Sequence, residues 1–92
     1  MSTKDTLDTF MFTIQSPANI IWSGQVYSVH SKNEEGEFTI FPDHANFLSP
    51  IVKEAVIVTF GDGTERNYNF NHSVLYVRDG EAILYVNDFV DT

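Results

Sequence analysis

The stretch that decides the fold covers residues 36–51 and reads GEFTIFPDHANFLSPI. Its first half predicts a short strand, because Phe38 and Ile40 fall on one face of the period-two pattern that a pleated strand imposes. Pro42 and Asp43 then predict a turn, since proline fixes its own φ and lacks an amide donor, while aspartate supports a local side-chain-to-backbone turn. A strand and a turn therefore lie at the centre of the chain.

Polar and apolar side chains are interleaved after this turn, over residues 44–49. We interpret this segment as a contact loop, because an imidazole beside an aromatic residue is a mixture typical of binding hot spots. His44 would then hydrogen-bond across an interface while Phe47 anchors it. In the alternative interpretation, His44 only satisfies loop carbonyls, and Phe47 and Leu48 enter the core.

Alternating runs on both sides of this stretch predict further strands. Residues 55–58 are apolar at every position, which is typical of a strand covered on both faces. Asp79-Gly80 predicts a hairpin, because both residues tolerate the positive φ of a type I′ turn. The other predicted extended segments are residues 10–15, 20–22, 25–31 and 64–70, and the two arms of the hairpin, 73–77 and 81–86.

No segment shows a helical period. The sequence therefore predicts an all-β fold, a two-layer β-sandwich or flattened barrel of about 8–10 short, mainly antiparallel strands. The 92 residues suffice for one domain, covering 1–92. We expect a loose N-terminus over residues 1–7 and a C-terminal tail over 88–92, where the pattern is lost.

Thirteen acidic residues against five basic ones give a formal net charge of −8. Nucleic acid is not expected as a partner, because its phosphate backbone would be repelled. A basic protein surface is the better electrostatic match, although acidity can also serve solubility alone. No apolar run approaches the ~20 residues that span a bilayer, so we expect contact with a membrane only through a partner.

The residues that could carry chemistry form no recognised catalytic or metal-binding motif. Cysteine is absent, and His30, His44 and His72 include no closely spaced pair, so no metal site is predicted. Glu34 and Glu35 lie in a polar connector, where neither carboxylate would be tuned for acid catalysis. Phosphate-binding glycine motifs and nucleophile elbows are also missing. We therefore expect no cofactor and no active site.

A family resemblance rests on the central stretch. The pattern Gly-Glu-(apolar)-x-Ile-(aromatic)-Pro-x-His-Ala-x-(apolar)-Leu, downstream of Trp22-Ser23-Gly24, resembles the N-terminal β-sandwich domain of the epsilon subunit of F-type ATP synthase, called delta in mitochondria. The likeness extends from Phe10 to about Asp88 and is most specific over residues 36–48. The chain departs from the family pattern at Thr39, Asp43, Asn46 and Lys53-Glu54.

The resemblance implies a non-catalytic subunit of the rotating central stalk. Such a subunit joins gamma to the polar loops of the c-ring and couples proton- or sodium-driven rotation to ATP synthesis. It would lie at the cytoplasmic face of the bacterial inner membrane, peripheral to it as part of F1. Because the sequence ends at Thr92, a few residues after the last predicted strand, we expect no C-terminal helical hairpin and no inhibition through one.

The resemblance also implies roles for particular positions. Glu37 matches the carboxylate that approaches the c-ring loops. The positions that match or adjoin the gamma contact are Ser16, His44, Asn46, Phe47 and Leu48. Two other functions stay open on the residues alone: a free-standing carbohydrate- or peptide-binding module with Trp22, Tyr27, Tyr68 and Tyr76 as an aromatic platform, and a small metal-dependent enzyme that uses the histidines.

Overall fold

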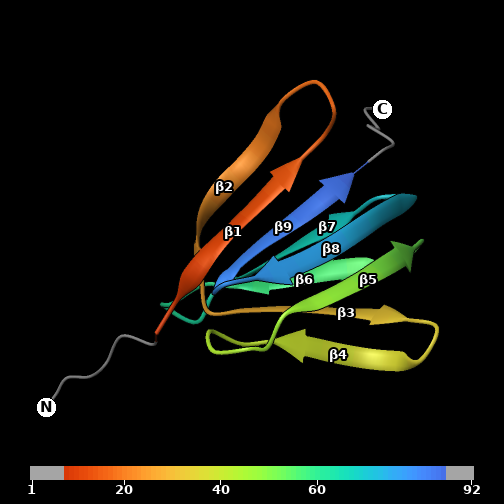
Figure 1. Cartoon of the computed structure of the whole chain (residues 1–92). Coiled ribbons are helices and arrows are strands. Elements are labelled where there is room, and N and C mark those ends of the chain that lie inside the picture. Colours follow the sequence, from red (N-terminus) through yellow and green to blue (C-terminus); the bar gives the residue numbers. More distant parts are fainter. Residues whose placement is uncertain (1–7, 87–92) are drawn as a thin grey trace, which may run out of the picture.

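The alternating apolar residues of the chain build two β-sheets stacked face to face (Figure 1). The computed structural model describes residues 8–86, so the predicted loose start and tail lie outside the described residues. The strands are β1 (Phe10–Gln15), β2 (Ile20–Val26), β3 (Ser28–Asn33), β4 (Gly36–Ile40), β5 (Phe47–Val52), β6 (Ala55–Thr59), β7 (Glu65–Asn69), β8 (His72–Arg78) and β9 (Glu81–Val86).

One sheet has five strands in the order β2-β1-β9-β8-β5, and the other has four in the order β4-β3-β6-β7. β1 runs parallel to β9, and all other neighbours are antiparallel. This arrangement confirms the predicted all-β sandwich. No helix forms within residues 8–86, so none there could cross a membrane.

The core lies between the sheets and follows the period of two. In β1, for example, Phe12 and Ile14 are fully buried while Met11 and Thr13 on the other face are half-buried. The five-stranded sheet also contributes Phe10, Val26, Ile51, Leu75, Val77, Ala82, Leu84 and Val86, and the four-stranded sheet contributes Val29, Ile40, Val56 and Val58.

The two sheets are joined at one side by the side chain of Trp22. Its ring packs against Phe12 of its own sheet at 6.3 Å between centroids and against Phe60, at the end of β6, at 5.8 Å. The ring also lies over Gly24, where a Cβ atom would come within 2.8 Å of two ring carbons. This contact explains why a glycine follows the tryptophan at a spacing of two.

The segment 25–31, predicted as a single strand, instead changes sheet in its middle. Val26 ends β2 and Ser28 begins β3, and the amide of Tyr27 between them donates to the carbonyl of Thr59 at 2.7 Å. Val26 and Val29 would point to opposite faces of one continuous strand. Because the chain changes sheet at Tyr27, both side chains instead point into the core and are buried. The prediction of one strand was wrong for that reason.

The second half of the segment interpreted as a contact loop, residues 47–49, belongs to a strand. β5 begins at Phe47 and pairs with β8 through Val52, and its burial alternates strictly along the strand. Pro50 lies inside it. Proline is tolerated here because β5 is an edge strand of its sheet, where one side of the backbone needs no ladder partner.

Two further predictions have different outcomes. The apolar run 55–58 lies in β6, which ends at Thr59, but only Val56 and Val58 are buried. Ile57 faces outward and is half-buried, so no second layer covers this strand among the described residues. The hairpin turn is confirmed: φ is 53° at Asp79 and 82° at Gly80, as a type I′ turn requires.

Candidate docking faces

The outer face of the five-stranded sheet carries large apolar side chains. Leu48 is 65% exposed, Val52 52%, Tyr85 43% and Val74 37%. We call the surface formed by these four residues together with Pro50, Tyr76 and Ile83 the apolar face.

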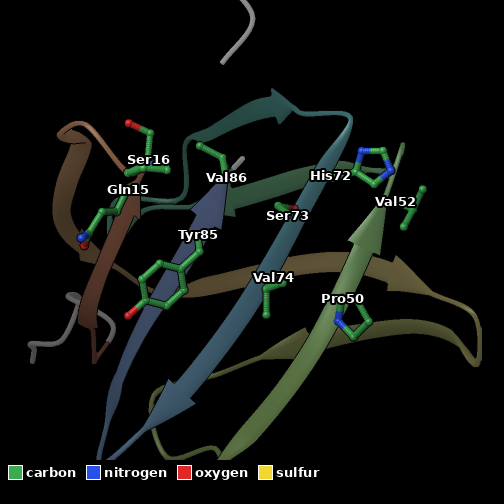
Figure 2. Close-up of a pocket in the computed structure, with 10 residues that line it drawn as sticks. Gln15, Ser16, Pro50, Val52, His72, Ser73, Val74, Tyr85 and Val86 are labelled. Atoms are coloured by element: carbon green, nitrogen blue, oxygen red, sulfur yellow. The ribbon is translucent and has the colours of Figure 1, made fainter. Parts of the chain in front are cut away.

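The register of three strands brings these residues together. Tyr85 lies opposite Val74, which lies opposite Pro50, so one row of side chains crosses β9, β8 and β5. Figure 2 shows these three side chains on neighbouring strands. Ile83, Tyr76 and Leu48 form the next row in the same way.

At one end the apolar face is hollowed into a groove of about 520 Å³. An antiparallel sheet that faces water normally carries polar side chains on its outside. A contiguous apolar surface of this kind marks an interaction site in a folded protein. The apolar face is therefore a candidate docking surface.

Ser16 lies at the grooved end of the apolar face and is buried. Its amide donates to the carbonyl of Asn19 at 2.9 Å, and its hydroxyl donates to the same carbonyl at 3.2 Å. The amides of Ala18 and Asn19 also donate to this hydroxyl, each at 3.3 Å. In this structure the Ser16 side chain thus closes the turn between β1 and β2.

His44 and Asn46 lie at the opposite end of the sheet, just before β5. The His44 ring packs edge-on against Phe47 at 5.7 Å, and its Nδ1 lies 2.9 Å from the carbonyl oxygen of Ala45. The Asn46 side chain accepts a hydrogen bond from the amide of Asp79 at 3.1 Å, and so ties this segment to the β8–β9 turn.

Phe47 and Leu48 point to opposite sides of β5. Phe47 packs against the core and lies 5.1 Å from Phe38 between ring centroids, whereas Leu48 is exposed on the apolar face. The second of the two interpretations given for this segment holds in part: His44 satisfies a loop carbonyl and Phe47 is packed inside, but Leu48 does not enter the core. Contact of His44 across an interface stays a prediction.

A cation lies beside this end of the apolar face. Arg78 Nη1 donates to the Tyr76 hydroxyl at 3.1 Å, and its Nε lies 3.5 Å from Asp79 Oδ2. The hydrogen bond to Tyr76 and the neighbouring Asp79 raise the pKa of Arg78 above its ordinary value. Arg78 therefore stays charged at any working pH.

Glu37 lies elsewhere, on the outer face of the four-stranded sheet. It is on edge strand β4, directly opposite Lys32 of β3, and its side chain is 71% exposed. The loop after β3 adds Glu34 and Glu35, which together with Glu54 line a second groove between this loop and β5. We call Glu34, Glu35, Glu37 and Glu54 the acidic end.

The structure disperses the residues of the two other predicted functions. Trp22 packs in the seam between the sheets, Tyr68 stacks on Phe70 beside the core, Tyr27 contacts Phe41, and only Tyr76 lies on the apolar face. No aromatic platform forms from these four. Within residues 8–86, no three histidine or acidic side chains lie close enough together to hold a metal ion.

Sequence reasoning identified Leu48 but missed the rest of the apolar face. Val74 and Tyr85 fall within the predicted strands 73–77 and 81–86, but the face that they share was not predicted. A usable signal was present, because the two-residue Asp79-Gly80 turn fixes the register of its hairpin and so places Val74 opposite Tyr85.

These features define a class of protein: a small β-sandwich that presents one apolar outer face and one acidic end to other molecules. The match to known proteins is narrower. Residues 9–92 match the family model described as ATP synthase, Delta/Epsilon chain, beta-sandwich domain. The chain belongs to this family.

Individual relatives agree with the family match. The ATP synthase epsilon chain of a Nitratiruptor species is 31% identical over 84 residues, which are 91% of this chain and 65% of that protein. The epsilon chain of Chlorobium limicola is 28% identical over 79 residues, 86% of this chain and 90% of that protein. The chain spans only 55% and 50% of the epsilon chains of Clostridium botulinum (strain Eklund 17B / Type B) and Hyphomonas neptunium.

Solved structures show the same fold. A chain in the cryo-EM structure of the Euglena gracilis mitochondrial ATP synthase, OSCP/F1/c-ring, superposes with a TM-score of 0.81 at 15% identity, covering 97% of this chain and 57% of that one. A chain in the Tetrahymena thermophila mitochondrial ATP synthase central stalk/c-ring structure gives 0.74 at 13% identity, covering 95% of this chain and 69% of that one.

Proposed function

We propose that the chain is a central-stalk subunit of an F-type ATP synthase, which joins the gamma subunit to the c-ring and has no active site of its own. It would couple ion-driven rotation to ATP synthesis. The observation that carries this proposal is the apolar face on a chain of the epsilon family. The complex would hold the chain peripheral to the membrane, at the cytoplasmic face in a bacterium.

The apolar face is the surface that we assign to gamma. Leu48 lies on it, Ser16 lies at its grooved end, and Asn46 lines a small hollow with Leu48 and Tyr76 at the other end. His44 and Phe47 would support that second end from beside and beneath it. The five positions implied by the family resemblance therefore surround one surface, which supports a single docking site.

The acidic end is the surface that we assign to the c-ring. Glu37 lies on the outer face of the four-stranded sheet, so a partner bound there leaves the apolar face of the other sheet open. The other three carboxylates lie nearer, since their groove is also lined by Leu48, Pro50 and Val52 of the apolar face. A carboxylate such as Glu37 can meet cationic groups on polar loops, and the net charge of −8 adds long-range attraction to a basic surface.

A sandwich suits this role because torque requires a connection that does not yield. The apolar face and Glu37 belong to sheets that share one close-packed core, and such cores transmit strain with little compression. A displacement imposed at Glu37 would therefore be carried to the apolar face through the shared core.

The gamma assignment is tested by calorimetry with gamma from the same source. Leu48→Asp should weaken binding by about 30-fold or more, because it replaces the most exposed large side chain of the apolar face by a charge. Asn67→Asp puts the same charge on an exposed edge strand of the other sheet and should bind like wild type. Equal affinities for the two variants would contradict this docking surface.

The c-ring assignment is tested with the complex of gamma and this chain and with c-rings in nanodiscs. Glu37→Lys should weaken docking by about tenfold, since it replaces an attraction by a repulsion. Glu65→Lys, on the exposed edge strand β7, makes the same charge change away from the acidic end. Docking that is lost equally in both would mean that only net charge matters.

A further inference from the structure

One side chain on the outer face of the four-stranded sheet links two others. His30 of β3 lies directly opposite Thr39 of β4. Glu37, two residues before Thr39 on β4, is the diagonal neighbour of His30. The ring atom Nδ1 lies 2.7 Å from the Thr39 hydroxyl oxygen, and Nε2 lies 3.3 Å from Oε1 of Glu37. His30 therefore uses both ring nitrogens, and one of them holds the carboxylate of the acidic end.

The same geometry suits both charge states of the ring. In the neutral form with the proton on Nε2, the Thr39 hydroxyl donates to Nδ1 and Nε2–H donates to Glu37. In the protonated form both nitrogens donate, and the threonine oxygen accepts. Protonation thus leaves the contacts in place and changes only the charge beside the carboxylate.

A hydroxyl, an imidazole and a carboxylate in a row are also the components of a hydrolytic triad. Here the side chains of His30 and Glu37 are 36% and 71% exposed. Solvent at this exposure screens the pair, whereas activation of a hydroxyl depends on a water-excluded site with donors for an oxyanion. Thr39 and His30 are therefore better suited to orient the Glu37 carboxylate, and to set the charge beside it, than to perform acyl transfer.

Few other charges face His30 among the described residues. On its own strand Lys32 lies two positions on, opposite Glu37. β6 presents the uncharged Ala55, Ile57 and Thr59 to this face, with Ile57 directly opposite His30. Beyond β6, Glu65 of β7 lies opposite Thr59.

We propose that His30 is a positioning residue that sets the charge which Glu37 presents to a cationic partner. Neutral His30 orients the carboxylate and leaves its charge available. Protonated His30 forms an ion pair with it and competes with the partner's cation. Histidine ordinarily changes charge between about pH 5 and 8, so docking through Glu37 weakens on acidification in that range. This inference rests on the docking role proposed for Glu37.

The coupling is measured first in the isolated chain, by following the imidazole signals of His30 by NMR from pH 5 to 8. Removing the carboxylate with Glu37→Gln should change the imidazole signals of His30, because Nε2 loses the carboxylate oxygen that lies 3.3 Å away. Glu65→Gln removes one charge from the same face at a greater distance and serves as the control. Equal changes in the two variants would overturn the inference.

The consequence is measured by docking of the gamma complex to c-rings at pH 6 and pH 8. Wild type should bind about two- to fivefold more weakly at pH 6, the range expected for one exposed cross-strand charge pair. His30→Gln keeps hydrogen-bonding groups but cannot be protonated, so it should lose this pH dependence while binding as wild type does at pH 8. Any titration of the c-ring itself affects both proteins and cancels in the comparison.

The outcomes separate the two proposals. If Glu37→Gln docks like wild type at both pH values, the docking role of Glu37 is overturned, and the inference about His30 with it. If Glu37→Gln weakens docking but wild type and His30→Gln have the same pH profile, only the inference about His30 is overturned.

Discussion

The two outer faces of this sandwich obey different rules. On the four-stranded sheet the outward positions of β3, β4 and β7 are mainly polar or charged, as on His30, Glu37 and Asn67. On the five-stranded sheet the outward positions of β5 and β8 include Leu48 and Val74, which are 65% and 37% exposed. Both sheets bury the same kind of inner face, so the difference does not arise from the core.

The comparison separates residues that the fold requires from residues that it does not require. Apolar residues on an outer face add nothing to a core that the other face already fills, and they increase the risk of aggregation. The row of exposed apolar residues on one sheet, against the half-buried Ile57 on the other, points to a partner for the first sheet. The charged face, by contrast, is what an outer face of an antiparallel sheet requires in water, so only specific contacts such as that of His30 with Glu37 single out a function there.

The largest effect should come from breaking the core that both faces share. Phe12 is fully buried and packs against Trp22. We expect Phe12→Ala to lower the free energy of unfolding by about 3–5 kcal/mol, through lost burial and the cavity that remains. Chemical denaturation measures this, with Thr13→Ala on the other face of β1 as the control, expected to cost about 1 kcal/mol or less. Similar losses in both variants would show that the faces of β1 are not distinguished by burial.

A smaller effect should follow from disturbing the seam that fixes one face relative to the other. A Cβ at Gly24 would lie 2.8 Å from the Trp22 ring, which is held between Phe12 and Phe60. We expect Gly24→Ala to destabilise the fold by about 1–3 kcal/mol, as overpacking does. Gln25→Ala, an exposed neighbour on β2, should change the free energy of unfolding by less than about 0.5 kcal/mol. An unchanged midpoint for Gly24→Ala would mean that the ring can move aside at no cost.

The sequence predicted those parts of the fold that depend on local pattern. Strict alternation identified β1, and Asp79-Gly80 identified the hairpin of β8 and β9 with its turn type. Two predictions failed where the alternation is interrupted. Tyr27 adds one step between two strands of different sheets, and the polar residues among Phe47 and Leu48 favour a loop, although Phe47 begins β5.

The candidate sites were less accessible to sequence reasoning, because they depend on register between distant strands. Leu48, Tyr76 and Ile83 form a row only because β5 and β9 both pair with β8. The contact of His30 with Glu37 depends on a short hairpin, but it requires the register of β3 and β4 and the side-chain rotamers as well. Alternation gives the face of each residue within a strand, and not its neighbours across the sheet.

The smallest predicted effect separates the two docking surfaces without any substitution. Raising the salt concentration from about 0.1 M to about 1 M shortens the screening length from about 10 Å to about 3 Å. Docking to c-rings through the acidic end should then weaken by about tenfold, whereas affinity for gamma through the apolar face should change by less than about threefold, since apolar burial is not screened. Calorimetry with gamma and nanodisc docking at both salt concentrations measure the two responses. If both affinities fell in parallel, the net charge of −8 would control each interface, and the contrast between the two faces would carry no functional meaning.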